Sequence, residues 1–205
     1  MKELQDRCKE LKLHFLAGNL PTLLEKTADK ELDPLETLSE LLQAESDDKH
    51  YQLQQRRIKN ARFGTVKTFE DFKFSHPKKI NEEKIRHHCR LNFLERTENI
   101  ILIGTVGLGK THLAKAIGYK ACLAGKSVQF TTAAEIINKL TASQANDRLE
   151  RALKAYAKVD LLIIDELGYM PLDKYACDLL FQVISRRYEV GSIVLTSNRP
   201  YGKWQ

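Results

Sequence analysis

The sequence predicts an α/β protein in which helices flank a parallel β-sheet and a small helical domain precedes that sheet. The first 66 residues show apolar residues at helical spacing and almost no glycine. From residue 100 onward, short apolar runs alternate with helical stretches. Most of these runs are apolar throughout, which is typical of parallel strands that are buried on both faces. We therefore assign residues 1–66 to a helical N-terminal domain and residues 67–205 to an α/β core.

The N-terminal domain begins with a predicted helix over about Leu4–Ala17, which ends at Gly18. A second helix begins at Asp33, because Asp33 can cap it, Pro34 suits its first position and Glu36 completes a capping box. Beyond residue 51 this helix becomes basic. Its apolar residues recur at helical spacing and predict a stripe that packs against the first helix, with Leu35, Leu38, Leu41 and Leu42 meeting Leu4, Leu11, Phe15 and Leu16.

An irregular stretch over Gly64–Pro77 separates the two predicted domains. The elements of the core then follow in order. They are a strand at Ile100–Ile103, a helix at Lys110–Ala124, a strand at Val128–Phe130, a helix opened by a capping box at Thr132–Glu135, a helix at Asn146–Lys158, a strand at Leu161–Ile164, a helix at Tyr175–Tyr188 and a strand at Ile193–Leu195. This alternation predicts a parallel sheet with helices on both faces.

The composition is that of a globular protein without a membrane partner. Hydrophobic residues make up 42% of the chain and charged residues 29%. Its apolar runs are all shorter than the roughly 20 residues that a membrane span needs, and the N-terminus lacks the apolar stretch of a signal peptide. We therefore expect a cytoplasmic protein. The four cysteines stand far apart without a C-x-x-C pair, which favours neither a disulfide framework nor a zinc site.

The net charge of +6 is concentrated in one segment of the chain. Between Lys49 and Arg90 there are twelve Lys or Arg residues and four acidic residues, which gives this segment a net charge of +8. A localised basic excess is typical of proteins that bind a polyanion, and nucleic acid is the usual one. The segment indicates a nucleic-acid partner, although a solvated basic face would have the same composition.

The segment after the first strand fits the phosphate-binding pattern G-x-x-x-x-G-K-[ST] with the residues Gly104, Thr105, Val106, Gly107, Leu108, Gly109, Lys110 and Thr111. Glycines allow the backbone to turn tightly with its N–H groups toward a phosphate. The following helix directs its positive N-terminal end at the same anion. Lys110 supplies charge for the β- and γ-phosphates, and Thr111 supplies a hydroxyl for Mg²⁺. The segment therefore predicts binding of ATP with Mg²⁺.

A pair of acids ends the buried strand that begins at Leu161. The carboxyl end of this strand lies at the same sheet edge as the phosphate loop, so Asp165 can hold the magnesium and Glu166 can polarise the attacking water. A third polar group closes the strand Ile193–Leu195. There Asn198 is the candidate to bond the water or the γ-phosphate, with Thr196 and Ser197 as alternatives. An asparagine in this position is also a common turn residue.

With these residues assembled, the sequence resembles the AAA+ ATPases, specifically the IstB-like helper proteins of bacterial insertion sequences. DnaC-like helicase loaders and DnaA are more distant relatives. The likeness runs from about Leu13 to Gln205 and rests on the phosphate loop, on the strings Lys67–Phe72, Phe130–Glu135, Leu161–Pro171, Leu180–Glu189 and Thr196–Pro200. Leu167-Gly168-Tyr169 points to the IstB-like proteins, because a generic ATPase core does not need it.

The resemblance implies that a helical N-terminal region engages double-stranded target DNA and that the ATPase core forms an ATP-dependent homo-oligomer on it. It also implies cooperation with a transposase. Carried over onto this sequence, Gly104–Thr111 bind phosphate, Lys110, Glu166 and the sensor Asn198 are catalytic, and Thr111 and Asp165 hold the metal. Phe69 and Phe72 correspond to the start of the adenine pocket, although ordinary packing would explain them equally well.

We expect the DNA contacts to come from the basic residues Arg56, Arg57, Lys59 and Arg62, of which Arg56, Lys59 and Arg62 fall on one helical stripe. Such contacts would engage backbone phosphates more than bases.

The IstB-like helper proteins continue past the point that matches Trp204-Gln205 into a fifth strand and a helical lid with the arginine finger. We therefore expect this chain to lack both parts, which puts ATP hydrolysis in question but not ATP binding.

The sequence is also compatible with three other interpretations. A DnaC-like loader of a replicative helicase would have the same motifs. A small-molecule kinase would share only the phosphate loop and would lack the acid pair with a sensor asparagine. A DNA-binding protein with a decayed, non-hydrolysing ATPase fold would keep the loop but lose turnover.

Overall fold

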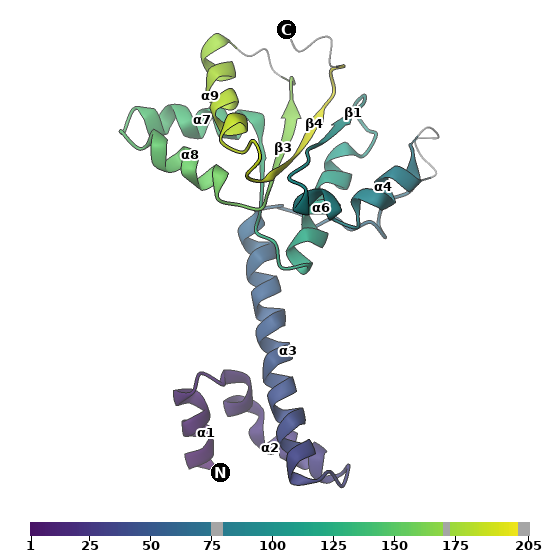
Figure 1. The fold of residues 1–205 in the computed structure, drawn as a ribbon, viewed down its shortest axis with the longest axis vertical. Helices are drawn as coiled ribbons and strands as arrows, with labels where there is room; N and C mark the ends of the chain where they lie inside the picture. The colour runs from purple at the N-terminus through teal and green to yellow at the C-terminus, as the bar shows by residue number, and fades with distance from the viewer. Residues whose placement is uncertain (75–79, 170–172, 201–205) are drawn as a thin grey trace. The chain divides into compact units, whose positions relative to one another are not determined.

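A computed structural model describes residues 1–74, 80–169 and 173–200 (Figure 1). It divides into two compact units, Met1–Gln55 and Arg56–Gln205, whereas we placed the boundary of the domains at residues 66/67. The reason for the difference is that Ala61 and Phe63 belong to the buried core of the second unit. Our expectations for Ser75–Pro77, for Met170-Pro171 and for Trp204-Gln205 lie outside the described residues.

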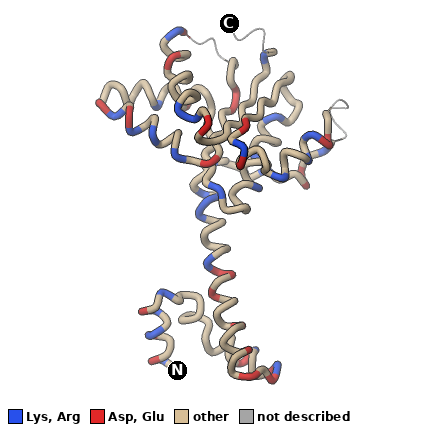
Figure 2. The backbone as a smooth tube through the Cα atoms, in the orientation of Figure 1, with Lys and Arg blue, Asp and Glu red and all other residues tan. Residues whose placement is uncertain are grey.

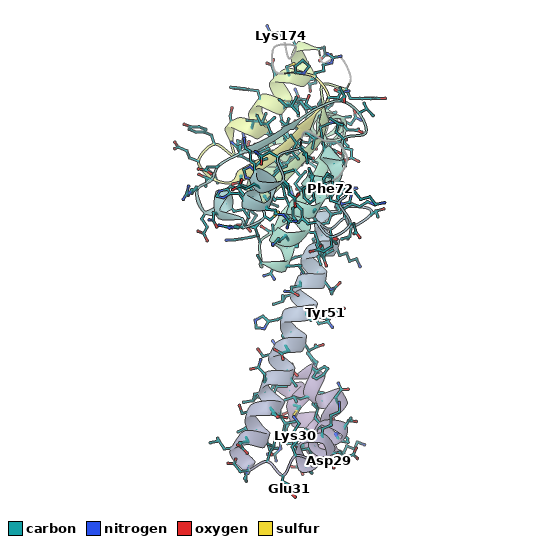
Figure 3. The ribbon with its side chains drawn as sticks, turned by 90° about the vertical axis from the view of Figure 1, so that its right-hand side faces the viewer. Asp29, Lys30, Glu31, Tyr51, Phe72 and Lys174 are labelled. Carbon is teal, nitrogen blue, oxygen red and sulfur yellow. The ribbon has the colours of Figure 1, made fainter. Side chains whose placement is uncertain are left out.

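The first unit is a small helical assembly of α1 (Lys2–Glu10), α2 (His14–Ala28) and the first part of α3 (Pro34–Ala61). Its core consists of Cys8, Leu16 and Ala17, packed against partly buried residues that include Leu41 of α3. Glu45 of α3 is 3% exposed, and its carboxylate accepts a hydrogen bond from Leu16 N at 2.9 Å. A tight turn at Asp29–Glu31 joins α2 to α3 (Figure 3).

The prediction of one helix ending at Gly18 is wrong. The chain breaks earlier, at Lys12, which has a left-handed φ of 58°. Leu13 N donates to Cys8 O and Lys12 N donates to Lys9 O, the bonding pattern of a Schellman helix end, here without a glycine. Gly18 lies inside α2, where it packs against nothing that a side chain would displace.

The start of α3 confirms the predicted capping box, since Glu36 N donates to Asp33 Oδ1 at 2.8 Å and Asp33 N donates to Glu36 Oε2 at 3.0 Å. The predicted apolar stripe is wrong in part. Leu41 packs into the core, but large fractions of four other leucines stay exposed, namely Leu4, Leu11, Leu38 and Leu42, and Leu35 is 75% exposed. The two short helices α1 and α2 cover only the Leu41 side of α3.

The second unit contains a four-stranded sheet in the order β1-β4-β3-β2, and all its strand pairs are parallel. The strands are β1 (Ile100–Ile103), β2 (Val128–Thr132), β3 (Leu161–Leu167) and β4 (Ser192–Ser197). All four predicted strands are confirmed, and β2, β3 and β4 are longer than predicted. The carboxyl ends of β1, β3 and β4 therefore meet at one edge of the sheet.

Helices cover both faces of this sheet (Figure 1). On one face, α6 (Lys110–Leu123) packs on Leu161, Ile163 and Val194. On the other, α7 (Ala133–Gln144), α8 (Leu149–Ala157) and α9 (Lys174–Ser185) pack on alternate residues of the same strands. Gly118 lets α6 approach the sheet closely, because a Cβ there would lie 2.6 Å from Ile163 Cδ1. This confirms the predicted α/β fold.

Two short helices, α4 (Glu82–His88) and α5 (Asn92–Glu95), precede β1 and were not predicted as separate elements. The capping box at Thr132 and Glu135 opens α7 as predicted. The helix expected from Asn146 begins three residues later, because Asp147 has a left-handed φ of 53°. Within the described residues, no helix combines the length and the apolar character that a membrane crossing requires.

One buried arginine fixes the loops that enter β3 and β4. Arg187 is 1% exposed and donates to the carbonyls of Tyr156 at 2.7 Å, Val159 at 2.9 Å and Ser192 at 2.8 Å. Burial lowers the pKa of Arg187 to about 10, which leaves it charged at neutral pH. It thereby holds the amino ends of the two strands whose carboxyl ends carry the predicted site residues.

Candidate functional site

The phosphate loop joins β1 to α6 at the carboxyl edge of the sheet. Gly107 and Gly109 have left-handed φ angles of 85° and 77°, and α6 begins directly after Gly109. A Cβ on Gly109 would lie 2.5 Å from Phe72 Cε2, so this position also needs glycine for space. Lys110 Nζ donates to Thr105 O at 2.8 Å, which folds the side chain back over its own loop.

Asp165 connects this loop to β3. Asp165 is 3% exposed, and its Oδ1 accepts a hydrogen bond of 3.0 Å from Thr111 Oγ1. The hydroxyl of Thr196, on the neighbouring strand β4, donates to the same oxygen. Two hydroxyls from two elements therefore hold one carboxylate oxygen beside the start of α6.

Glu166 follows in a β-bulge. Ile164 pairs with Leu195, but Leu167 pairs with Ser197, so β3 has one residue more than β4 over this interval. Glu166 occupies the bulge with a left-handed φ of 60°, a conformation that costs a non-glycine residue about 1–2 kcal/mol. Its N–H donates to Thr196 Oγ1 at 3.0 Å. The bulge turns Glu166 out of the buried strand, and its side chain is exposed.

One cavity of about 360 Å³ is lined by Val106, Gly107, Gly109, Lys110, Thr111, Glu166, Tyr169, Thr196 and Asn198. Asp165 is not among these lining residues, but it bonds Thr111, which is. Asn198 Oδ1 is buried, and among the described residues it has no hydrogen-bond partner. A buried amide oxygen of this kind calls for a donor such as water. The lining includes two residues to which our sequence analysis gave no role of their own, Tyr169 and Thr196. The sequence offers Thr196 only as an alternative to Asn198, together with Ser197.

The oxygen donors at this cavity suit Mg²⁺. Thr111 and Asp165 offer a hydroxyl and a carboxylate, and Glu166 follows Asp165 in the chain. Mg²⁺ is commonly held by one or two carboxylates together with phosphates and waters. A protein cage of three or more acidic, histidine or cysteine ligands does not occur in the described parts of the chain. The residues therefore fit a magnesium ion that reaches the protein with a nucleotide.

Phe69 and Phe72 do not line this cavity. They border a separate one of about 520 Å³ beside α6, together with Phe74 and Arg86. Phe72, labelled in Figure 3, is 9% exposed and packs with Ile85 and with Leu113 of α6. Its observed contacts are those of a packing residue under the phosphate loop, and a role of either phenylalanine in adenine binding stays a prediction.

The four basic residues predicted to bind DNA are not equivalent in the structure. Arg56 and Lys59 are exposed on α3, whereas Arg57 is half-buried, with its guanidinium 4.0 Å from the position of a Cβ on Gly125. The predicted stripe of three residues is wrong at Arg62. Because α3 ends at Ala61 and Arg62 has a left-handed φ of 61°, this residue leaves the helical spacing.

Charge is divided unequally between the two units (Figure 2). Residues 1–55 contain twelve acidic and seven basic residues, a net charge of −5. Since the whole chain is +6, residues 56–205 carry +11. All four predicted DNA contacts belong to the basic second unit.

Comparison with solved structures defines the class of the second unit. The chain matches AMPPCP-bound DnaA from Aquifex aeolicus with a TM-score of 0.60 and 23% identity, over 68% of this chain and 44% of DnaA. Domain III of DnaA from Thermotoga maritima matches with a TM-score of 0.55 and 26% identity, over 67% of this chain and 58% of that domain. The DnaC helicase loader matches with a TM-score of 0.53 and 23% identity, over 72% of this chain and 81% of the loader. The second unit therefore has the AAA+ P-loop fold, and the chain spans less than half the length of the Aquifex DnaA chain.

Sequence comparison narrows this class. The family described as "IstB-like ATP binding protein" matches residues 6–205. An ATP-binding protein of insertion sequence IS21 from Pseudomonas aeruginosa is 40% identical over 204 residues, which cover 100% of this chain and 77% of that protein. The corresponding protein of IS5376 from Geobacillus stearothermophilus is 38% identical, over 100% of this chain and 82% of that protein. The chain belongs to the IstB-like ATP-binding protein family.

Proposed function

We propose that this chain is an ATPase that helps a transposase to insert DNA, and that it assembles on duplex target DNA when ATP is bound. The observation that carries the proposal is the convergence of Lys110, Thr111, Glu166 and Asn198 on one cavity, with Asp165 bonded to its wall. The names of the relatives, which place them in insertion sequences and call them ATP-binding, support the transposition role. The chain would act in the cytoplasm, where target DNA is accessible.

Each site residue has a distinct task in this proposal. Backbone N–H groups of the phosphate loop and the N-terminus of α6 bind the phosphates, and Lys110 exchanges its bond with Thr105 O for a γ-phosphate oxygen. Thr111 and Asp165 would hold Mg²⁺, which supplies positive charge against the phosphates when it is bound. The exposed carboxylate of Glu166 accepts a proton from the attacking water. The side-chain oxygen of Asn198, which has no hydrogen-bond partner in the described parts of the chain, orients that water.

Assembly on DNA would use the basic second unit. Its net charge of +11 supports contact with phosphates, and the exposure of Arg56, Lys59 and Arg62 is compatible with such contacts. ATP would favour a homo-oligomer along the duplex, and the transposase would engage that oligomer and stimulate its ATP turnover. Hydrolysis then releases the assembly from DNA.

The test is Glu166→Gln, which removes the proton acceptor and keeps the size of the side chain. We expect unchanged ATP affinity, ATP turnover lower by about 100-fold or more, and slower release from duplex DNA in the presence of ATP and Mg²⁺. Fluorescence anisotropy of labelled DNA measures the release. The matched control is Glu189→Gln, because Glu189 also has a left-handed φ (57°) but does not line the cavity. Equal losses of ATP binding and of turnover in Glu166→Gln would contradict the proposed role, and a wild-type chain that binds no ATP would contradict the proposed function itself.

A further inference from the structure

Thr196 occupies a position between the two acids of the site. It lies near the end of β4, pairs with Leu102 of β1 on one side and is 1% exposed. Its Oγ1 donates to Asp165 Oδ1 and accepts the 3.0 Å hydrogen bond from Glu166 N. A hydroxyl has one proton to donate and lone pairs to accept with. Thr196 uses both capacities, and it uses them on two successive residues of β3.

The bulge explains why Glu166 needs such a partner. The extra residue in β3 takes the Glu166 N–H out of the regular ladder between β3 and β4. A backbone N–H without an acceptor in a largely buried strand would cost free energy. The Thr196 hydroxyl provides the acceptor, and the left-handed conformation of Glu166 is thereby held in place.

We propose that Thr196 is a positioning residue that fixes Asp165 and Glu166 relative to each other. This inference rests on the proposed ATPase function and deepens it. A single hydroxyl sets the orientation of the acid that would hold the metal and also the backbone of the acid that would take the proton. Thr196 therefore acts through these two residues and not on the nucleotide, which separates its role from that of Asn198.

The chemistry of the side chain leads to a sharp choice of variants. Thr196→Val keeps the branched shape and removes the hydroxyl, so it leaves the Glu166 N–H without its acceptor and Asp165 Oδ1 with the Thr111 bond. Thr196→Ser keeps the hydroxyl and removes a methyl group. Ser192→Ala is the matched control, because Ser192 is a fully buried residue on the same strand whose hydroxyl bonds Phe93 O, at the opposite end of β4. If the valine variant does not fold, Thr196→Ala replaces it.

The first measurement uses the protein without nucleotide and does not depend on activity. Amide hydrogen exchange of Glu166, followed by NMR, should be about 10-fold faster in Thr196→Val than in the wild type. The amides of Leu162 and Ile164, in the middle of β3, should exchange at unchanged rates. Thr196→Ser should restore the slow exchange, and Ser192→Ala should not alter it. Equal exchange of the Glu166 amide in the wild type and in Thr196→Val would overturn the proposal.

The second measurement compares ATP binding with ATP turnover in the presence of duplex DNA and Mg²⁺. In Thr196→Val, kcat should fall by about 10- to 100-fold, the range typical of residues that orient metal ligands, while the dissociation constant of ATP stays within about threefold. The Mg²⁺ concentration for half-maximal turnover should rise, and Thr196→Ser should recover most of the loss. Unchanged kcat, or an equal fall in Ser192→Ala, would overturn the proposal. A wild-type chain without ATP binding would instead overturn the proposed function, and the ATP titration reports that separately.

Discussion

At the scale of single residues, the position of Lys110 indicates how the phosphate loop would respond to its ligand. Lys110 is half-buried, and its Nζ donates to Thr105 O at 2.8 Å. A phosphate oxygen is a stronger acceptor than a neutral carbonyl, because both partners are then charged. The lysine therefore has a bond to give up on binding, and the gain in affinity is the difference between the two interactions.

We predict that Lys110→Ala weakens ATP binding by about 10- to 100-fold, since a hydrogen bond to a charged group contributes about 1.5–3 kcal/mol. Equilibrium dialysis with ATP and Mg²⁺ measures the change. The control is Lys115→Ala on the same helix, whose Nζ lies 4.7 Å from the centre of the Phe130 ring and outside the cavity. Thermal unfolding of both variants should stay close to that of the wild type. Unaltered ATP affinity in Lys110→Ala would refute the assignment of this loop.

The sequence predicts some of these residues and not others for a physical reason. Gly109, Lys110 and Thr111 are recognisable because phosphate binding demands their chemistry at fixed spacing, and the structure places them on one cavity. The bulge at Glu166 and the two hydrogen bonds of the Thr196 hydroxyl depend on the register between β3 and β4. Register is a property of two distant segments, so no local pattern reveals it.

At the scale of elements, the first turn of α7 shows how a cap is coupled to pH. Glu135 Oε2 accepts hydrogen bonds from Thr132 N and from Thr131 Oγ1, both at 3.0 Å. The hydrogen bond from Thr132 N is the main reason that the pKa of Glu135 is lowered. A lowered pKa in the folded state means that the ionised carboxylate stabilises the fold above its unfolded pKa of about 4.3.

We therefore predict that Glu135→Gln destabilises the protein at pH 7 by about 0.5 kcal/mol, a small value because the side chain is largely exposed. The difference should shrink as the pH falls through the lowered pKa of the folded state, where the wild type loses the same charge. Urea unfolding at pH 7 and near pH 3 measures this. The control is Glu83→Gln, in the first turn of α4 and outside the hydrogen bond that caps this helix. A difference that grows toward low pH would show that the sign is wrong.

The elements also show where local pattern is sufficient. The strands and α6 follow from apolar runs and from their flanking motifs, and the structure confirms them. The helix break at Lys12 does not follow from such a pattern, because no local sequence pattern marks a lysine in a left-handed conformation. Gly18 does match the pattern of a helix end, but it lies inside α2. The exposure of Leu35 and Leu38 likewise depends on which side of α3 the two short helices meet.

At the scale of the whole molecule, the charge division separates two units of opposite sign. The first unit carries −5 and the second +11. We predicted the basic segment but placed its arginines in the N-terminal domain, because the helix predicted from Asp33 becomes basic beyond residue 51. In the structure α3 crosses the boundary of the units. The exposed residues Arg56, Lys59 and Arg62 belong to the unit whose net charge favours a polyanion.

We predict that changing Arg56, Lys59 and Arg62 together to alanine flattens the slope of log affinity for duplex DNA against log salt concentration by about two to three, since each lost phosphate contact removes about 0.9. Binding should weaken alike across DNA sequences. Fluorescence anisotropy at several salt concentrations measures the slope. The control changes Lys2, Lys12 and Lys26 of the first unit to alanine, which removes the same charge from exposed positions. Equal slopes in the two triple variants would place the DNA contacts elsewhere.

The same charge division has a kinetic consequence. Before any contact forms, a duplex attracts residues 56–205 and repels residues 1–55 once they come within a Debye length of about 8–10 Å. Encounters that present the basic unit are therefore favoured over those that present the acidic one, and fewer collisions are wasted. For the DNA binding proposed above, the rate of association should be high at low salt and should fall as salt screens the charges of the two units.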